Sequence, residues 1–82
     1  MTTSMARAVV SALAERHGID IDQRGGIVAL SLASQTSESR LRSWIDGRAL
    51  SIKPKELARV QASARFSLVK PSGGGWGYVL DE

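Results

Sequence analysis

The spacing of apolar residues predicts a helix near the start of the chain, from about Ser4 to His17. Apolar residues recur there at three- and four-residue intervals, which places them on one side of a helix. Ser4 can cap the N-terminus of this helix, and Gly18 can end it. The apolar stripe consists of Ala6, Val9, Val10, Leu13 and Ala14.

Residues 27–34 follow a glycine pair and are apolar at most positions. The Leu-Ser-Leu alternation within this segment would suit a buried strand, whereas its length and its alanines favour a short helix buried on most sides. We predict the helix, because a polar break and a clearly amphipathic segment come next.

That next segment predicts a short helix with a narrow apolar stripe. Thr36 or Ser37 can cap it, and an acidic residue in the first turn suits the helix dipole. Gly47 ends it. The inward-facing residues have i, i+3 and i+4 spacing and are Leu41, Trp44 and Ile45.

A further amphipathic helix is predicted to start at residues 51–54, where Pro54 suits a first turn, and to end near Ala64. The period then changes to that of two short strands, residues 66–69 and 76–80, joined by a glycine-rich loop. We expect one face of this hairpin to pack on the helices or on a second copy of the chain. That face carries Phe66, Leu68, Trp76, Tyr78 and Leu80.

The predicted fold class is therefore mainly α with a C-terminal β-hairpin. We expect a four- to five-helix helix-turn-helix domain followed by two antiparallel strands, in a single domain over residues 1–82. Its helical part covers residues 1–64 and its hairpin residues 65–82.

Composition excludes several classes of protein. The 82-residue chain has no cysteine, which removes disulfides and thiolate metal sites, and a lone histidine, His17, cannot build a metal centre. The core of so short a chain has little room for a catalytic cleft, so we expect no enzyme, no cofactor and no small-molecule substrate. No apolar run is long enough to span a membrane and no secretory signal is evident, so a cytoplasmic location is expected.

The charge is distributed unevenly along the chain. The formal net charge is +3, yet residues 40–70 hold eight of the basic residues and only two of the acidic ones. This concentration of positive charge favours a surface that binds a polyanion.

Two helices joined by a tight polar break, the second of them short and basic, are the arrangement that reads the DNA major groove. Arg42 can donate two hydrogen bonds to guanine, and the serines around it can contact bases or phosphates. The predicted base-reading residues are Ser37, Glu38, Ser39, Arg42 and Ser43. Glu38 could accept a hydrogen bond from cytosine or simply support the helix dipole, and we favour the second role. The predicted phosphate contacts are Arg40, Arg48, Lys53, Lys55 and Lys70.

The segments Leu32-Ala33, Ser37 to Arg48 and Glu56-Leu57-Ala58-Arg59-Val60 together resemble the Cro/lambda-repressor-like (XRE-type) helix-turn-helix family. The resemblance covers about half the chain. It implies a sequence-specific DNA-binding regulator, commonly a small phage or plasmid protein that acts as a homodimer.

This chain departs from the family pattern around the turn. Ser31 stands where the family prefers Ala, Gln35 where it prefers Gly, and Ser34 and Thr36 at positions that are normally apolar. These departures predict either a longer turn or a different register of the preceding helix.

The C-terminal hairpin resembles the wing of winged-helix proteins, which would place Lys70 and the glycine-rich loop at the DNA backbone or in the minor groove. Alternatively it pairs across a two-fold axis, or simply completes the core. The leading functional hypothesis is a DNA-binding transcription regulator, a repressor acting as a homodimer. Two other hypotheses are a protein-interaction module or inhibitor that docks through its aromatic hairpin, and an architectural excision or recombination factor.

Overall fold

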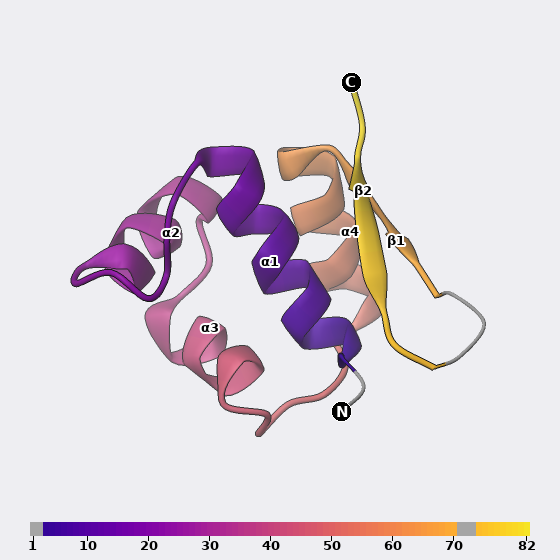
Figure 1. Ribbon diagram of the computed structural model, residues 1–82, viewed down its shortest axis with the longest axis horizontal. Coiled ribbons are helices and arrows are strands. Elements are labelled where there is room, and N and C mark those ends of the chain that lie inside the picture. The colour runs from indigo at the N-terminus through magenta and orange to yellow at the C-terminus, as the bar shows by residue number, and fades with distance from the viewer. Residues whose placement is uncertain (1–2, 71–73) are drawn as a thin grey trace.

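The computed structural model describes residues 3–70 and 74–82, which form four helices and one antiparallel hairpin (Figure 1). This arrangement confirms the predicted mainly α fold with a C-terminal hairpin. Residues 71–73 of the predicted glycine-rich loop lie outside the described residues. The elements are α1 (Met5–His17), α2 (Gly26–Ser34), α3 (Glu38–Ile45), α4 (Pro54–Ala64), β1 (Phe66–Val69) and β2 (Gly77–Leu80).

Helix α1 is the centre of the fold and contacts all the other helices and both strands. Figure 1 shows it crossing the middle of the molecule, with α2 on one side and α4 and the hairpin on the other. Its caps are those that the sequence predicts: the Ser4 Oγ accepts a hydrogen bond from the Arg7 amide, and Gly18 adopts a left-handed conformation. The predicted stripe is the core, with Val9 and Val10 fully buried.

Segment 26–34 is a helix, as predicted, but the expectation that it is buried on most sides is wrong. Only Gly26, Leu30 and Ser34 of α2 are buried. Leu32, on the opposite side, is 78% exposed. A helix that is apolar all round gives no sequence signal for which side faces inward, and the neighbouring helices cover only one. Gly26 is required where the preceding loop passes close by, because a Cβ there would overlap the Asp20 carbonyl oxygen.

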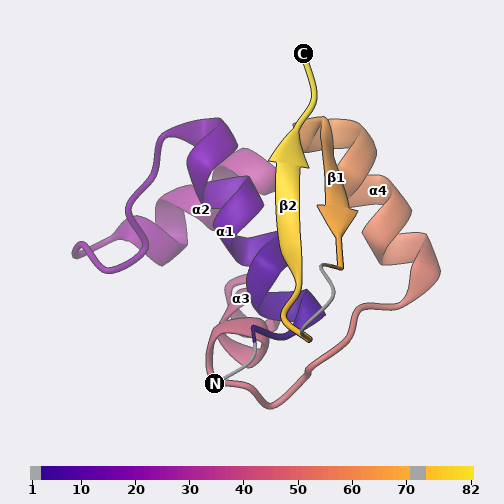
Figure 2. The same ribbon diagram turned by 45° about the vertical axis from the view of Figure 1, so that its right-hand side comes forward.

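The hairpin packs on the helical part rather than standing apart from it. Phe66 pairs with Leu80 and Leu68 with Tyr78, so these four side chains share a face, and that face packs against the core. Figure 2 shows the hairpin lying over α1 and α4. Strand β2 begins one residue later than predicted, at Gly77. Trp76 is left half-buried before the strand, and its amide donates to the Thr3 carbonyl at 2.9 Å.

Arg16 ties the hairpin and α4 to α1. Its guanidinium donates to the carbonyl oxygens of Ala64 at 2.6 Å, Arg65 at 2.8 Å and Asp81 at 2.6 Å. Beside it, the Tyr78 hydroxyl donates to the Glu15 carboxylate at 2.8 Å, and this hydrogen bond raises the pKa of Tyr78. Within the described residues, no helix has the length and apolar character needed to cross a bilayer.

Candidate nucleic-acid interface

Helix α3 presents a polar outer face, as its sequence predicts. The Ser37 Oγ caps the helix by accepting from the Arg40 amide at 3.2 Å. Leu41 and Trp44 point into the core and are 0% and 4% exposed. Four of the five predicted base-reading residues are exposed and Ser43 is half-buried. The exposed four are Ser37, Glu38, Ser39 and Arg42.

Arg42 is the most prominent donor on this face, with 57% of its side chain exposed. It forms an i, i+4 ion pair with Glu38 at 3.8 Å, a long and solvated contact that leaves most guanidinium hydrogens available. Ser43 lies at the edge, where its carbonyl accepts from the amides of Arg48 at 3.0 Å and Ala49 at 3.2 Å. The outer face of α3 is therefore centred on Arg42.

Three of the predicted phosphate contacts, one on α3 and two at the start of α4, lie together. A shallow depression of about 440 Å³ separates α3 from the start of α4, and Arg40, Lys53 and Lys55 line it together with Glu56. Trp44, Ala49 and Ile52 form its apolar part, and Ser43 and Ser51 add hydroxyl groups. We call this feature the basic depression. Its three cations against one carboxylate give it a positive charge.

The other two predicted phosphate contacts lie elsewhere. Arg48 is on the loop after α3, 78% exposed and 4.0 Å from Asp46. Lys70 is on the hairpin, with its Nζ 5.3 Å from the centre of the Trp76 ring. Within the described residues the hairpin contacts α1 and α4 but neither α2 nor α3. Lys70 is therefore not among the residues that line the basic depression.

The turn between α2 and α3 contains three residues, 35–37, so the longer turn, one of the two predicted alternatives, is wrong, and the different register of the preceding helix stays a prediction. Three or four residues are usual for such a turn. Gln35 stands where the resembled family prefers Gly, and it adopts the left-handed conformation that favours glycine, with φ 54° and ψ 38°. The chain therefore keeps the short turn at the cost of a strained residue.

Ser34 and Thr36, the polar residues at positions that are apolar in the resembled family, are buried and hydrogen-bonded. The Ser34 hydroxyl donates to the Leu30 carbonyl at 2.6 Å, and the Ser31 hydroxyl donates to the Thr36 carbonyl at 2.6 Å. Thr36 is 3% exposed and its hydroxyl lies 3.3 Å from the Ser34 carbonyl. Hydrogen bonds here take the place of the apolar contacts expected at these positions.

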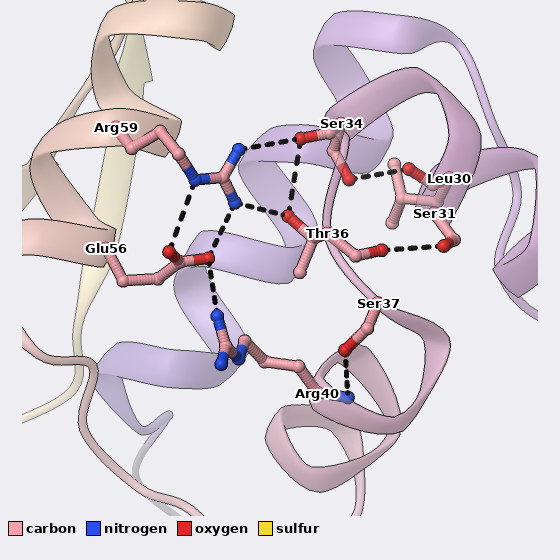
Figure 3. Close-up of polar contacts among 8 residues, drawn as sticks. All are labelled: Leu30, Ser31, Ser34, Thr36, Ser37, Arg40, Glu56 and Arg59. Atoms are coloured by element: carbon pink, nitrogen blue, oxygen red, sulfur yellow. Dashed lines mark hydrogen bonds and ion pairs between the residues drawn. The ribbon is translucent and has the colours of Figure 1, made fainter.

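Arg59 of α4 completes this network (Figure 3). Its guanidinium donates to the Ser34 carbonyl at 3.2 Å and to the Thr36 hydroxyl at 2.9 Å, and so attaches α4 to the turn. It also donates to both carboxylate oxygens of Glu56, at 2.6 and 3.2 Å. Arg40 of α3 reaches the same carboxylate at 3.2 Å. Through Glu56, helices α3 and α4 share one set of polar contacts.

The charge of Glu56 is stabilised by these two arginines. The hydrogen bond from Arg59 lowers the pKa of Glu56, partial burial opposes it, and the positive charges of Arg59 and Arg40 lower it further. Glu56 and Arg59 were not predicted from the sequence as a pair that joins α3, α4 and the turn. The available signal was the i, i+3 spacing of the pair together with the unexpected polar residues in the turn.

Comparisons with protein-family models, with curated proteins and with solved structures find no match to this chain. The domain itself offers three features that bear on function: a short helix with an exposed arginine and serines, a three-residue turn before it, and a positively charged depression beside it.

Proposed function

We propose that this protein is a sequence-specific double-stranded DNA-binding protein of the XRE-like helix-turn-helix kind, a transcriptional repressor that acts as a homodimer. The observation that carries the proposal is the exposed polar face of α3, centred on Arg42 and flanked by the basic depression. The proposal includes a cytoplasmic location, because phage and plasmid DNA lies in the bacterial cytoplasm.

In this proposal α3 enters the major groove with its polar outer face toward the bases. Arg42 donates two hydrogen bonds to the O6 and N7 atoms of a guanine, releasing its solvated contact with Glu38. Ser37 and Ser39 are short enough to bring the helix close to the bases or phosphates. The Glu38 carboxylate remains in the first turn, where the helix dipole stabilises it.

The basic depression provides the contact with the DNA backbone. Lys53 and Lys55 line it and are exposed, so a phosphate can approach them without unfolding any element. Glu56 lies on the same wall, but its carboxylate is already bonded to Arg59 and Arg40, which reduces its repulsion of a phosphate. Arg48 extends the contact along one strand, and Lys70, which does not line the basic depression, would contact a phosphate outside it.

Selection from random duplexes followed by sequencing tests the proposal. We expect a two-fold symmetric consensus with a guanine in each half. Arg42→Ala should reduce the preference for that consensus over random DNA by about 5- to 150-fold, the range for one lost bidentate contact. Lys53→Ala is the matched control: it should weaken binding to all duplexes alike and lower the salt slope by about one.

Two results would contradict the proposal. One is the absence of salt-dependent duplex binding at micromolar protein. The other is an Arg42→Ala protein that keeps the full preference of the wild type. Thermal unfolding followed by circular dichroism verifies that both variants are folded, which we expect because both side chains are exposed.

The alternative of a protein-interaction module that docks through the hairpin has less support. The aromatic rings of Phe66 and Tyr78 pack on the chain's own core. Trp76 remains half-buried, with Lys70 over its ring. A partner of the hairpin would therefore meet Trp76, and Trp76→Ala would abolish its capture while leaving DNA affinity unchanged.

A further inference from the structure

Helix α2 has an apolar side that faces solvent. Val28 and Leu32 are 44% and 78% exposed, and Ala29 and Ala33 beside them are also exposed. These four residues form what we call the α2 outer face. A surface helix normally carries polar or charged residues on this side, whereas α2 contains no charged residue at all. Contiguous exposed apolar residues are characteristic of interaction sites.

The shape of the α2 outer face is suited to a second copy of itself. Val28 and Leu32 are four residues apart and form a row of larger side chains, and the small side chains of Ala29 and Ala33, also four apart, form the neighbouring row, which can serve as the groove in ridge-into-groove packing. In a two-fold pair each helix would place its ridge in the groove of the other, which is the commonest mode of helix packing. Two-fold contacts require such a self-complementary surface.

The charge distribution also favours a second copy as the occupant. Two copies of a chain with net charge +3 repel each other least where their positive charge is lowest. Residues 40–70 hold most of the bases, whereas α2 has none and the loop before it holds Asp20, Asp22 and Arg24. Figure 1 places α2 at the side of the molecule away from the hairpin, and its outer face shares no residue with the polar face of α3.

We propose that the α2 outer face is the surface through which two copies of this chain associate. The proposal rests on the homodimer of the proposed function and assigns its interface. The hairpin is a poorer candidate, because its apolar face is packed on α1 and its outer side is broken by the Ser67–Asp81 hydrogen bond at 3.1 Å.

The size of the interface sets the expected strength of association. A nine-residue helix is about 14 Å long, so two such helices cover less than the ~800 Å² per partner of a standard stable interface. We therefore expect a weak dimer in the absence of DNA. Two half-sites on one duplex would strengthen it by raising the effective concentration of one copy near the other.

Sedimentation equilibrium from micromolar to millimolar protein, without DNA, tests this assignment. Wild-type protein should associate reversibly to a dimer, and Leu32→Glu should raise the dissociation constant by at least about tenfold. Val79→Glu is the matched control, since Val79 is also an exposed aliphatic residue, 54% exposed, on the outer side of the hairpin. It should leave the dimer intact.

Ala29→Leu distinguishes specific helix packing from non-specific hydrophobic association. The larger side chain adds apolar surface but occupies the space beside Val28 and Leu32 that the partner helix needs. Specific packing therefore predicts a weaker dimer, whereas non-specific association predicts a stronger one. A wild-type monomer at millimolar concentration, an unchanged dimer in Leu32→Glu, or dissociation by Val79→Glu would each overturn the assignment. Monomeric wild type that binds lipid vesicles would overturn it in favour of a membrane.

A half-site assay keeps this test distinct from that of DNA binding. Leu32→Glu should bind a duplex with one half-site as tightly as the wild type does, and lose only the cooperative gain on two half-sites. Failure of the wild type to bind any duplex would contradict the proposed function, while the DNA-free dimer measurements would still decide the interface.

Discussion

Helices α2 and α3 are neighbours of similar length with opposite surfaces. α2 has no charged residue and keeps its apolar side chains on both its inner and outer sides. α3 turns Leu41 and Trp44 inward and exposes Glu38 and Arg42. Both are covered on one side by α1 and by each other.

This difference shows that hydrophobicity and burial are separate properties of a helix. Leu30 and Leu32 are the same residue type two positions apart, yet one is 0% and the other 78% exposed. The fold uses one side of each helix, and the composition of the other side is left to interactions outside the domain. In the two proposals made above, that side of α3 meets a polyanion and that side of α2 meets another apolar surface.

The largest expected change in the free energy of unfolding comes from replacing one leucine by alanine in each helix in turn. Leu41→Ala should destabilise the domain by about 2–5 kcal/mol, because it removes a fully buried side chain and leaves a cavity. Leu32→Ala should change stability by no more than about 0.5 kcal/mol, because Leu32 makes few contacts within the monomer. Urea unfolding at dilute protein concentration measures both. Equal losses in the two variants would refute the assigned faces.

A smaller effect concerns the polar contacts that hold α3 and α4 together. Glu56 has a lowered pKa in the folded protein, so its ionisation stabilises the fold above the pKa of the unfolded chain, about 4.3. That contribution is lost as pH falls through the lowered folded-state pKa. Glu56→Gln should therefore cost about 1 kcal/mol at neutral pH, a modest value because both arginines are partly solvated.

The difference in stability between the wild type and Glu56→Gln should shrink toward zero in acid. Urea unfolding at neutral pH and at successively lower pH measures this convergence. Glu38→Gln provides the comparison: the Glu38–Arg42 ion pair is long and exposed, so this variant should lose only the interaction with the helix dipole, about 0.3 kcal/mol, and should vary less with pH than Glu56→Gln. A pH-independent cost of Glu56→Gln would mean that the charge of Glu56 is not what stabilises the contact.

The smallest effect is expected at the turn between the two helices. Gln35→Gly should stabilise the domain by about 0.5 kcal/mol, since relief of the left-handed strain exceeds the entropy gained by the unfolded chain. Ala29→Gly, within α2, should destabilise by about 0.5–1 kcal/mol. Thermal unfolding of the two glycine variants should thus shift in opposite directions. A destabilised Gln35→Gly would show that the Gln35 side chain contributes more than its backbone costs.

Local patterns were sufficient to predict most elements. The caps of α1 at Ser4 and Gly18 and the Ser37 cap of α3 depend only on neighbouring residues, and the structure confirms them. The orientation of α2 could not be predicted, because a helix that is apolar on every side has no preferred inner face in its sequence.

The candidate site was predictable in its exposed part and not in its support. The exposure of Arg42 follows from the Leu41–Trp44 stripe, which sets the rotation of α3. The contact of Arg59 with Thr36 joins residues far apart in the sequence, and it depends on how α4 packs against α2. In the sequence Arg59 is one of several bases in a positive segment, and its i, i+3 spacing with Glu56 does not by itself predict a contact with a residue of the turn.

The central position of α1 has a consequence for synthesis of the chain. α1 is translated before the other elements, yet its apolar stripe is covered by all of them, including β2, and Arg16 is bonded as far along the chain as Asp81. Contacts between such distant segments delay folding until the later segment is available. While β2 is still inside the ribosome, part of the apolar stripe of α1 would therefore remain exposed to water and to chaperones. The domain would complete its folding in one late step, after β2 emerges.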